Sequence, residues 1–459
     1  MAQPKQTPLS YSLPAFSPTD YDNIDAQLQT LASYGFKWVT FTPTYRVKEN
    51  VTTKNVLIPG PAIRPQPAWL VRLKAFFGVI NKTKPKVLEV RDIRYALDLT
   101  TMPMIKLEAA VNAAVKAGFH VKIEPHLDYA VTLGTGFEQL WRMLMRFHPD
   151  DGTSMNPHYY AAILQQIFQI IQRASTLPRP ANAGPACFAL TLGSEIDVSV
   201  YEFPAAWEQV LRNLKALRAA AKLDNPFRLS FGHKLNYDTL TNAREHLSRV
   251  SRATKYASLG ARSIDDYNKA QISVKGYLSQ LDYVSFSFYQ PITPKLATGT
   301  FDWESPPTPA DEAAIAAEFG KVLDGLRTAV GPNVPLDIGE FGLGSVYDGP
   351  FRDEPGDFVK KDAQGNLVKD EGAHNARRKY IRALSAFLKA KKSDLAASRP
   401  RCSDYLPLTF WTVKHYDFLG LWDYPILVGE GDPYDHKLAV DDALKEWVTA
   451  YHNEVYGGP

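Results

Sequence analysis

The chain has 459 residues and a net charge of +3, with 45% hydrophobic and 22% charged residues. These values are ordinary for a globular protein and exclude an intrinsically disordered chain. The small net charge gives no strong field, so the composition does not predict binding to nucleic acid or to an anionic membrane surface.

The two cysteines and the apolar runs give little information about the cellular compartment of the protein. Cys187 and Cys402 are far apart and lack the spacing of a metal site, and Cys187 lies in an apolar run. We therefore expect a buried thiol and no disulfide. No run of 18 or more apolar residues predicts a membrane span, and the N-terminus lacks a signal-peptide hydrophobic region. The compartment stays open, with an exported location slightly favoured.

The chain begins with an alternation of short apolar strands and amphipathic helices. Ser10 to Phe16 reads as a strand, Tyr21 to Tyr34 as a helix closed by Gly35, and Phe36 to Thr42 as a second strand. Residues from about 46 to 98 are rich in proline and lysine and interrupt this rhythm. We expect them to form an inserted loop or subdomain.

The alternation then continues to the C-terminus. The expected helices are Ile105 to Gly118, Tyr159 to Ala174, Ala205 to Lys222, Ile264 to Gln280, Ala310 to Val330, about Ala373 to Ala390, and Val440 to Tyr451. The expected strands are His120 to about Glu124, Ala186 to Asp197, and the runs at 227–236, 282–291, 334–344 and 406–416. The segment from Tyr347 to Glu371 reads as a long βα loop.

Eight strands in order with intervening helices predict a (β/α)8 TIM barrel with long βα-loop insertions. We expect residues 1–459 to form a single catalytic domain. In such a barrel the residues at the C-terminal strand ends meet in one cleft. These candidates are Tyr45, Arg46, His126, Asp128, Ser194, Glu195, His233, Lys234, Tyr289, Gln290, Glu340, Trp411, Lys414 and His415.

Two of these candidates are carboxylates on nearly opposite strands. Glu195 ends the fourth expected strand and Glu340 ends the seventh. Cleavage of an acetal needs a proton on the leaving oxygen and stabilisation of an oxocarbenium-like carbon, and two carboxyl groups supply both. The pair therefore predicts glycosidic-bond chemistry.

Three motifs carry a resemblance to a known group of enzymes. The runs TLGSEID, LDIGEFG and LTFWTVKHYD resemble the strand-four, strand-seven and strand-eight signatures of glycoside hydrolase clan A. Within that clan, KIEPHLD followed by a G-x-E strand and an I-G-E strand is similar to the family 113 type, which includes β-mannanases. The resemblance implies a retaining hydrolase of β-linked polysaccharides or oligosaccharides. The long segments at 46–98 and 347–371 should raise walls around the cleft, which favours binding of several sugar units and endo action.

The resemblance also implies roles for single residues. Glu195 would be the acid/base, Glu340 the nucleophile, and Tyr289 a helper that hydrogen-bonds the nucleophile. Trp411 would form a platform under the sugar, and His126 would contact sugar hydroxyls. Ser194 stands where many members of the clan have asparagine, and its shorter side chain leaves the identity of the sugar open.

The remaining strand-end residues are expected to contact substrate. They are Asp128, Tyr45, Arg46, His233, Lys234, Lys414 and His415. The cations among them fit an acidic or substituted glycan, and equally fit charge balance for Glu195, Glu340 and Asp417.

Two other classes of function stay open. The barrel could hold a glycan without cleaving it, since a fold alone does not settle function. It could also be a metal-dependent hydrolase that uses His126, Asp128 and His233, although the chain shows no second histidine pair on an early strand. No glycine-rich loop predicts a phosphate-bearing cofactor, so we expect activity with no cofactor and no metal. Transglycosylation differs from hydrolysis only in the acceptor.

Overall fold

The computed structural model describes most of the barrel. The described residues are 9–15, 17–33, 36–58, 86–129, 142–143, 145–224, 228–242, 264–288, 292, 294, 301–341, 359–365, 367–369, 371–396 and 408–410.

Eight parallel strands form the centre of the molecule. They are β1 (Leu9–Ala15), β2 (Trp38–Ile58), β4 (His120–Ile123), β7 (Phe188–Ser194), β8 (Leu229–Asn236), β9 (Tyr283–Phe288), β10 (Leu336–Phe341) and β13 (Leu408–Phe410). Each strand pairs with the next one, and β1 pairs with both β2 and β13. The pairings therefore return to the first strand, and the predicted (β/α)8 barrel is confirmed.

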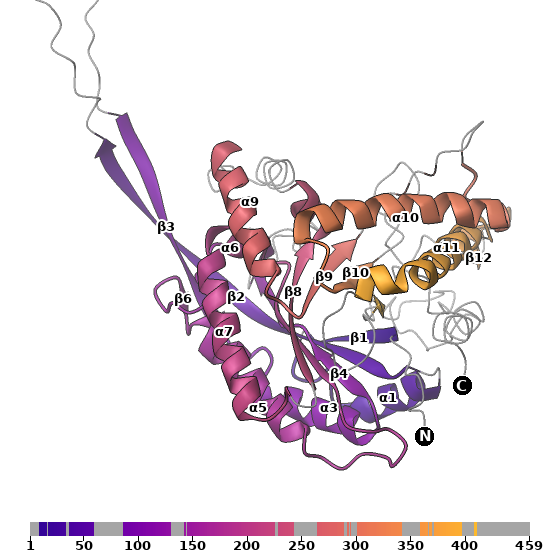
Figure 1. Cartoon of the computed structure of the whole chain (residues 1–459), viewed down its shortest axis with the longest axis horizontal. Coiled ribbons are helices and arrows are strands. Elements are labelled where there is room, and N and C mark those ends of the chain that lie inside the picture. Colours follow the sequence, from indigo (N-terminus) through magenta and orange to yellow (C-terminus); the bar gives the residue numbers. More distant parts are fainter. Residues whose placement is uncertain are drawn as a thin grey trace, which may run out of the picture.

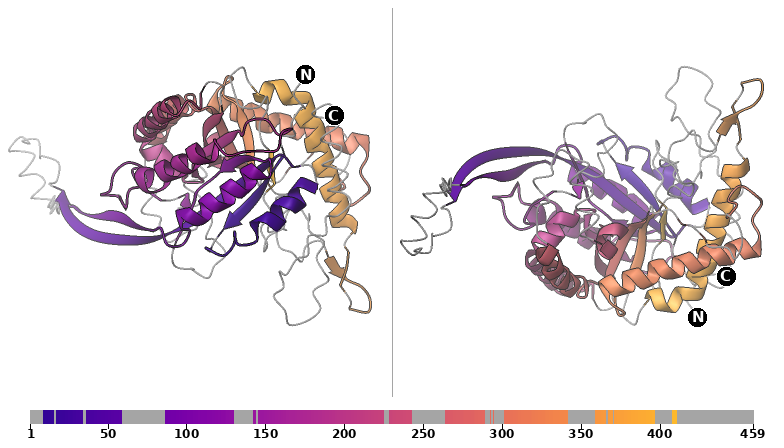
Figure 2. Two further views of the ribbon diagram at one scale, coloured as in Figure 1. Left: turned by 90° about the horizontal axis from the view of Figure 1, so that it is seen from below. Right: turned by 90° about the horizontal axis from the view of Figure 1, so that it is seen from above.

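Helices lie around the outside of these strands (Figure 2). They are α1 (Ile24–Ser33), α3 (Met104–Lys116), α5 (Gln165–Ala174) with a π-helical turn at Tyr160–Leu164, α6 (Asp197–Glu202), α7 (Pro204–Ala220), α9 (Ile264–Leu278), α10 (Pro309–Val330) and α11 (Glu371–Ala396). The helices expected from the sequence are found at these places within a few residues at each end. The expected helix from Val440 to Tyr451 lies outside the described residues. None of the described helices is long and apolar enough to cross a membrane.

Local sequence explains where α10 begins and ends. The Thr308 side chain accepts a hydrogen bond from the backbone N–H of Asp311, whose carboxylate accepts from the backbone N–H of Thr308. Pro309 fits the first helical position because it needs no donor there. Gly331 then ends the helix at a φ of 105°, a conformation that favours glycine.

The predicted insertion at about 46–98 contains a long antiparallel ladder. β3 (Lys86–Asp98) pairs with the outer part of β2, from Arg46 opposite Asp98 to Ile58 opposite Lys86. Figure 1 shows this two-stranded ribbon projecting from the rest of the molecule.

Three further short pairings extend the connections between strands and helices. β5 (His126–Tyr129) continues the parallel pairing with β2, and β6 (Met155–Asn156) pairs with β3. The predicted loop from Tyr347 to Glu371 contains the antiparallel hairpin of β11 (Val359–Lys361) and β12 (Leu367–Lys369).

The inside of the barrel is polar, in contrast to the apolar layer between strands and helices. Ser10 and Thr40 share a hydrogen bond of 2.6 Å, and Ser12 and Thr42 share one of 3.4 Å, all four side chains being buried. A barrel interior is more often filled with branched apolar side chains. This interior therefore has room for charged groups, provided that they pair with one another.

One sequence expectation was wrong. Cys187, which precedes β7 and is 6% exposed, is disulfide-bonded. Cys402 lies outside the described residues. The expectation of a thiol rested on distance along the chain, and a closed barrel brings segments together that are far apart in sequence.

Candidate active site

Two barrel strands carry an extra residue near their C-terminal ends. The register between β7 and β8 shifts between Thr191 and Ser194, and the register between β10 and β9 shifts between Ile338 and Glu340. An extra residue of this kind redirects the side chains that follow it. The two irregular strands are the ones that bear the predicted catalytic carboxylates.

Glu195 stands directly after the irregular end of β7. Its backbone has a φ of 55°, which is uncommon for a residue other than glycine, and strained backbone of this kind is enriched at functional sites. Its backbone N–H donates a 2.9 Å hydrogen bond to the Lys234 carbonyl oxygen. Its side chain is 7% exposed, with Oε2 at 3.4 Å from Nε of Arg142. The Glu195 backbone is thus fixed to β8, and its carboxylate lies beside Arg142.

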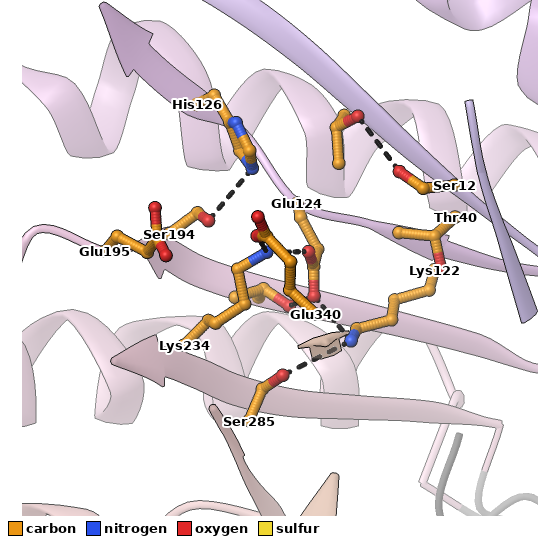
Figure 3. A network of polar contacts seen from close by, with 12 residues as sticks. Ser12, Thr40, Lys122, Glu124, His126, Ser194, Glu195, Lys234, Ser285 and Glu340 are labelled. Carbon is orange, nitrogen blue, oxygen red and sulfur yellow. Dashed lines mark hydrogen bonds and ion pairs between the residues drawn. The ribbon is translucent and has the colours of Figure 1, made fainter. Parts of the chain in front are cut away.

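Glu340, at the irregular end of β10, is held by the same lysine. Lys234 Nζ donates to Glu340 Oε2 over 2.9 Å and to Glu124 Oε2 over 2.8 Å. All three side chains are buried. Figure 3 shows Glu124 and Glu340 on either side of the Lys234 ammonium. Lys234 therefore contacts both predicted catalytic residues, because its carbonyl oxygen accepts from the Glu195 backbone N–H and its ammonium donates to the Glu340 carboxylate.

The charges continue from Glu124 toward the other end of the barrel. Lys122 Nζ lies 2.5 Å from Glu124 Oε1 and also forms an ion pair with Asp337. Ser285 donates a 2.8 Å hydrogen bond to Asp337. We call the residues Asp337, Lys122, Glu124, Lys234 and Glu340 the interior ion-pair chain.

Mutual pairing keeps the middle of this chain charged. Burial alone would lower the pKa of Lys234, but Glu124 and Glu340 outweigh it and raise the pKa above its ordinary value. Burial alone would likewise raise the pKa of Glu124, yet Lys122 and Lys234 hold it below its ordinary value. At the end of the chain, burial raises the pKa of Asp337, and Lys122 only partly offsets this effect.

A second network surrounds Glu195. His126, at the start of β5, has its Nδ1 at 2.6 Å from NH1 of Arg142 and its Nε2 at 2.9 Å from Oγ of Ser194. Burial, Arg142 and Lys234 hold the pKa of His126 well below its ordinary value, so the ring is neutral. Because arginine has only donors, Nδ1 accepts and the ring proton sits on Nε2, which donates to Ser194.

Asp128 completes this second network. Its Oδ1 lies 3.5 Å from NH1 of Arg142, and its side chain is 27% exposed. The structure thus brings six of the sequence-predicted site residues into one connected group. They are His126, Asp128, Ser194, Glu195, Lys234 and Glu340.

Three other predicted residues are not brought to this group. Tyr45 is fully buried, and its hydroxyl donates to the Met104 sulfur over 3.5 Å. Arg46 is exposed at the base of the β2–β3 ribbon. His233 is fully buried in the layer between the barrel and the helices, where its ring contacts Trp207 at a centroid distance of 4.9 Å.

The other sequence candidates lie outside the described residues. They are Tyr289, Gln290, Trp411, Lys414, His415 and Asp417. Their roles stay predictions.

The chemistry of a metal site was also open from the sequence. Within the described part of the chain, no three His, Cys, Asp or Glu side chains are grouped so that they could hold a metal ion. His126 and His233 lie in different environments, since one binds Arg142 and Ser194 and the other packs against helix α7.

The sequence prediction missed four residues that shape the site. They are Lys122, Glu124, Arg142 and Asp337. The sequence did contain a signal for two of them. Lys122 and Glu124 alternate with the apolar residues Val121 and Ile123, in and directly after a strand that is buried on both faces, so charged side chains on one face predict an interior ion pair. No comparable pattern marks Arg142.

No protein-family model matches this chain, and no curated protein matches it in sequence. Solved structures do resemble it in fold. A GH113 β-1,4-mannanase has a TM-score of 0.44 and 11% identity, over 97% of this chain and 98% of that one. The GH113 β-mannanase from Alicyclobacillus acidocaldarius has a TM-score of 0.42 and 13% identity, over 97% of each chain.

A third similar structure is the GH53 catalytic domain from Ignisphaera aggregans, with a TM-score of 0.41 and 12% identity over 97% of this chain and 96% of that one. The assignment of the (β/α)8 barrel rests on the strand pairings and not on these similarities.

Proposed function

We propose that this protein is a retaining glycoside hydrolase that cleaves β-glycosidic bonds in a polysaccharide or oligosaccharide. The observation that carries the proposal is the pair of nearly buried carboxylates, Glu195 and Glu340, at the irregular ends of β7 and β10. The Lys234 ammonium donates to the Glu340 carboxylate, and the Lys234 carbonyl oxygen accepts from the backbone N–H of Glu195. Two carboxyl groups at one barrel end are what double displacement at an acetal carbon needs.

In the first step, Glu340 attacks the anomeric carbon while Glu195 gives its proton to the leaving oxygen. The Lys234 ammonium, 2.9 Å from Glu340 Oε2, favours the ionised form that a nucleophile requires. The C–O bond to the leaving group breaks as the ester bond to Glu340 forms.

In the second step, Glu195 takes a proton from water, and the oxygen of that water displaces Glu340 from the sugar. Two inversions return the anomeric carbon to its original configuration. Arg142 Nε, 3.4 Å from Glu195 Oε2, and the Lys234 carbonyl oxygen orient Glu195 through both steps.

Sugar hydroxyls would be met by the network beside Glu195. Asp128 is the partly exposed member of this network and would accept a hydrogen bond from a sugar hydroxyl. The Nε2–H of His126 donates to Ser194 Oγ, and both of these side chains are buried. These groups suit a polyol, and endo action on a mannan- or glucan-like chain is the form of the reaction that we favour.

The acidic or substituted glycan considered from the sequence is less favoured. Among the described cations, Lys234 is committed to Glu124 and Glu340, and Arg142 contacts Glu195, Asp128 and His126. These two cations balance carboxylates of the site itself.

The test is to incubate the wild type and Glu340→Ala with β-linked neutral and acidic polysaccharides and to measure new reducing ends and product size. We expect release by the wild type, with oligomers as products, and a loss of at least about 10³-fold in Glu340→Ala. Azide should restore cleavage to Glu340→Ala and give a product of inverted configuration.

The matched control is Glu208→Ala, which removes a carboxylate from the surface of α7. This variant should keep wild-type activity. If the wild type binds oligosaccharides but releases no reducing ends, the barrel is a carbohydrate-binding protein and the proposal is wrong.

A further inference from the structure

Lys234 is shared between two carboxylates at nearly equal distances. Its Nζ lies 2.8 Å from Glu124 Oε2 and 2.9 Å from Glu340 Oε2. The side chains of Lys234 and Glu124 have no exposed surface, and that of Glu340 is 3% exposed. Because these side chains are shielded from water, the strength of each of the two ion pairs of Lys234 affects the protonation of its carboxylate far more than it would in water.

Glu124 has no surface with which to touch a substrate. Oε1 forms an ion pair with Lys122 and accepts a 3.3 Å hydrogen bond from Thr191, and Oε2 accepts from Lys234. Both oxygens are thus engaged inside the barrel. Any effect of Glu124 on the reaction must therefore come from its charge or pass through one of its partners, and not from contact with substrate.

We propose that Glu124 is a positioning residue that acts through Lys234 and sets how firmly the ammonium holds Glu340. The inference rests on the proposed function, because it gives a task to the group that would be the nucleophile. Glu124 draws part of the Lys234 charge away, so that Glu340 stays ionised without being locked into a full ion pair.

Charge counting gives the direction of the effect. The interior ion-pair chain holds the ammoniums of Lys122 and Lys234 against the carboxylates of Asp337, Glu124 and Glu340. If Glu124 becomes neutral, Lys122 keeps Asp337, and Lys234 loses one of its two carboxylate ion pairs while it keeps the one with Glu340. If Lys234 becomes neutral, Glu340 loses this ammonium. The two substitutions must therefore move the protonation of Glu340 in opposite directions.

Other titratable or charged groups surround the Lys234 ammonium. Glu195 directly follows β7, the neutral His126 lies on β5, and Arg142 contacts both. Lys122 lies on β4 and Asp337 on β10. On β9 the neighbours are the uncharged Ser285 and Ser287. Each variant below leaves all of these groups in place, apart from Ser285 in the control.

The experiment follows the carboxyl carbon of Glu340 by NMR in protein labelled with ¹³C-glutamate, the signal being assigned with Glu340→Gln. We expect Glu124→Gln to lower the pH midpoint of the Glu340 titration by about one unit and Lys234→Met to raise it by about one unit. With active protein, the acid limb of the kcat/KM profile should move in the same directions.

Ser285→Ala is the matched control. It removes a hydroxyl that binds Asp337 at the far end of the chain, without removing a charge, and should leave the Glu340 midpoint in place. An unchanged or raised midpoint in Glu124→Gln would overturn the inference. If Lys234→Met does not fold, the difference between the Glu340 midpoints of Glu124→Gln and Ser285→Ala is sufficient to test the inference.

The titration needs no turnover, so the two proposals can fail separately. Absence of hydrolysis on every glycan would remove the proposed function, while the titration would still show whether Glu124 controls Glu340 through Lys234. Conversely, an active enzyme whose Glu124→Gln variant loses activity without a shift of the acid limb would show a merely structural role for Glu124.

Discussion

His233 and Lys234 are neighbours on β8 and face opposite sides of the barrel wall. Lys234 points inward and binds two carboxylates, whereas His233 points outward between Trp207 and Tyr277. Both side chains are completely buried. The inner one keeps its charge because its partners are anions, and the outer one loses its charge because burial lowers the pKa of His233 to about 3.

The difference shows that burial by itself does not decide whether a group can take part in chemistry. The interior ion-pair chain is costly to desolvate and persists only because each charge has a partner. The outer layer gains its stability from apolar contacts instead. The inside of the barrel wall is the better place for a reaction whose transition state develops charge, because the charged groups there are already paired and oriented.

The largest effect on stability should come from removing the Lys234 ammonium, which pairs with two carboxylates inside the barrel. Lys234→Met leaves Glu124 and Glu340 buried without their shared cation, and we expect a loss of about 3–5 kcal/mol in the free energy of unfolding. Arg212→Ala breaks an ion pair of the same length, 2.9 Å to Glu208, on the exposed surface of α7. That loss should stay within about 0.5 kcal/mol.

Urea unfolding of the two variants measures both losses. Equal losses in the free energy of unfolding would show that the buried ion pairs of Lys234 stabilise the protein no more than an exposed ion pair does. The proposed energetic difference between the inside and the outside of the barrel wall would then be wrong.

Sequence patterns predicted the barrel well because its strands and helices are set by local periodicity. The strand at His120, the one at Phe188 and the carboxylates Glu195 and Glu340 at strand ends all followed from apolar runs and from where they stop. The partners of these carboxylates did not follow. Which strand faces which, and where an extra residue shifts the register, depends on the closed barrel as a whole.

Gly339 shows how such an irregularity supports the ion-pair chain. A Cβ at this position would lie 2.0 Å from Ser285 Oγ and 2.9 Å from Lys234 Cδ. We expect Gly339→Ala to cost about 1–3 kcal/mol, because the inner side chains have no room to move. Gly320, inside α10, has nothing within 4 Å of its Cβ position. Gly320→Ala should instead stabilise the protein by up to about 1 kcal/mol.

Thermal unfolding of these two variants tests the packing on each side. A stabilised Gly339→Ala protein would mean that the interior ion-pair chain can shift to admit a methyl group. In that case the close packing of Lys234 against β10 could not be what holds its ammonium in position.

The last expected effect concerns His233 on the outer side of the barrel wall and appears only on acidification. His233 stays neutral in the folded protein down to about pH 3, whereas the unfolded chain takes up a proton at this histidine below about pH 6.5. Stability should therefore fall as the pH drops from about 6.5 toward 3, by about 1.4 kcal/mol per pH unit for this one group. Burial lowers the pKa of His120 and His126 in the same direction, which steepens the wild-type slope.

His233→Phe should remove the His233 part of the slope, and Tyr277→Phe is its control. The control removes the same 3.0 Å hydrogen bond but no titrating group, so it should lower stability by a similar amount at every pH. Unfolding free energies at pH 7, 5.5 and 4.5 distinguish the two patterns. Parallel curves for wild type and His233→Phe would mean that His233 is protonated in the fold, and a charged group would then exist on the outer side without an anion beside it.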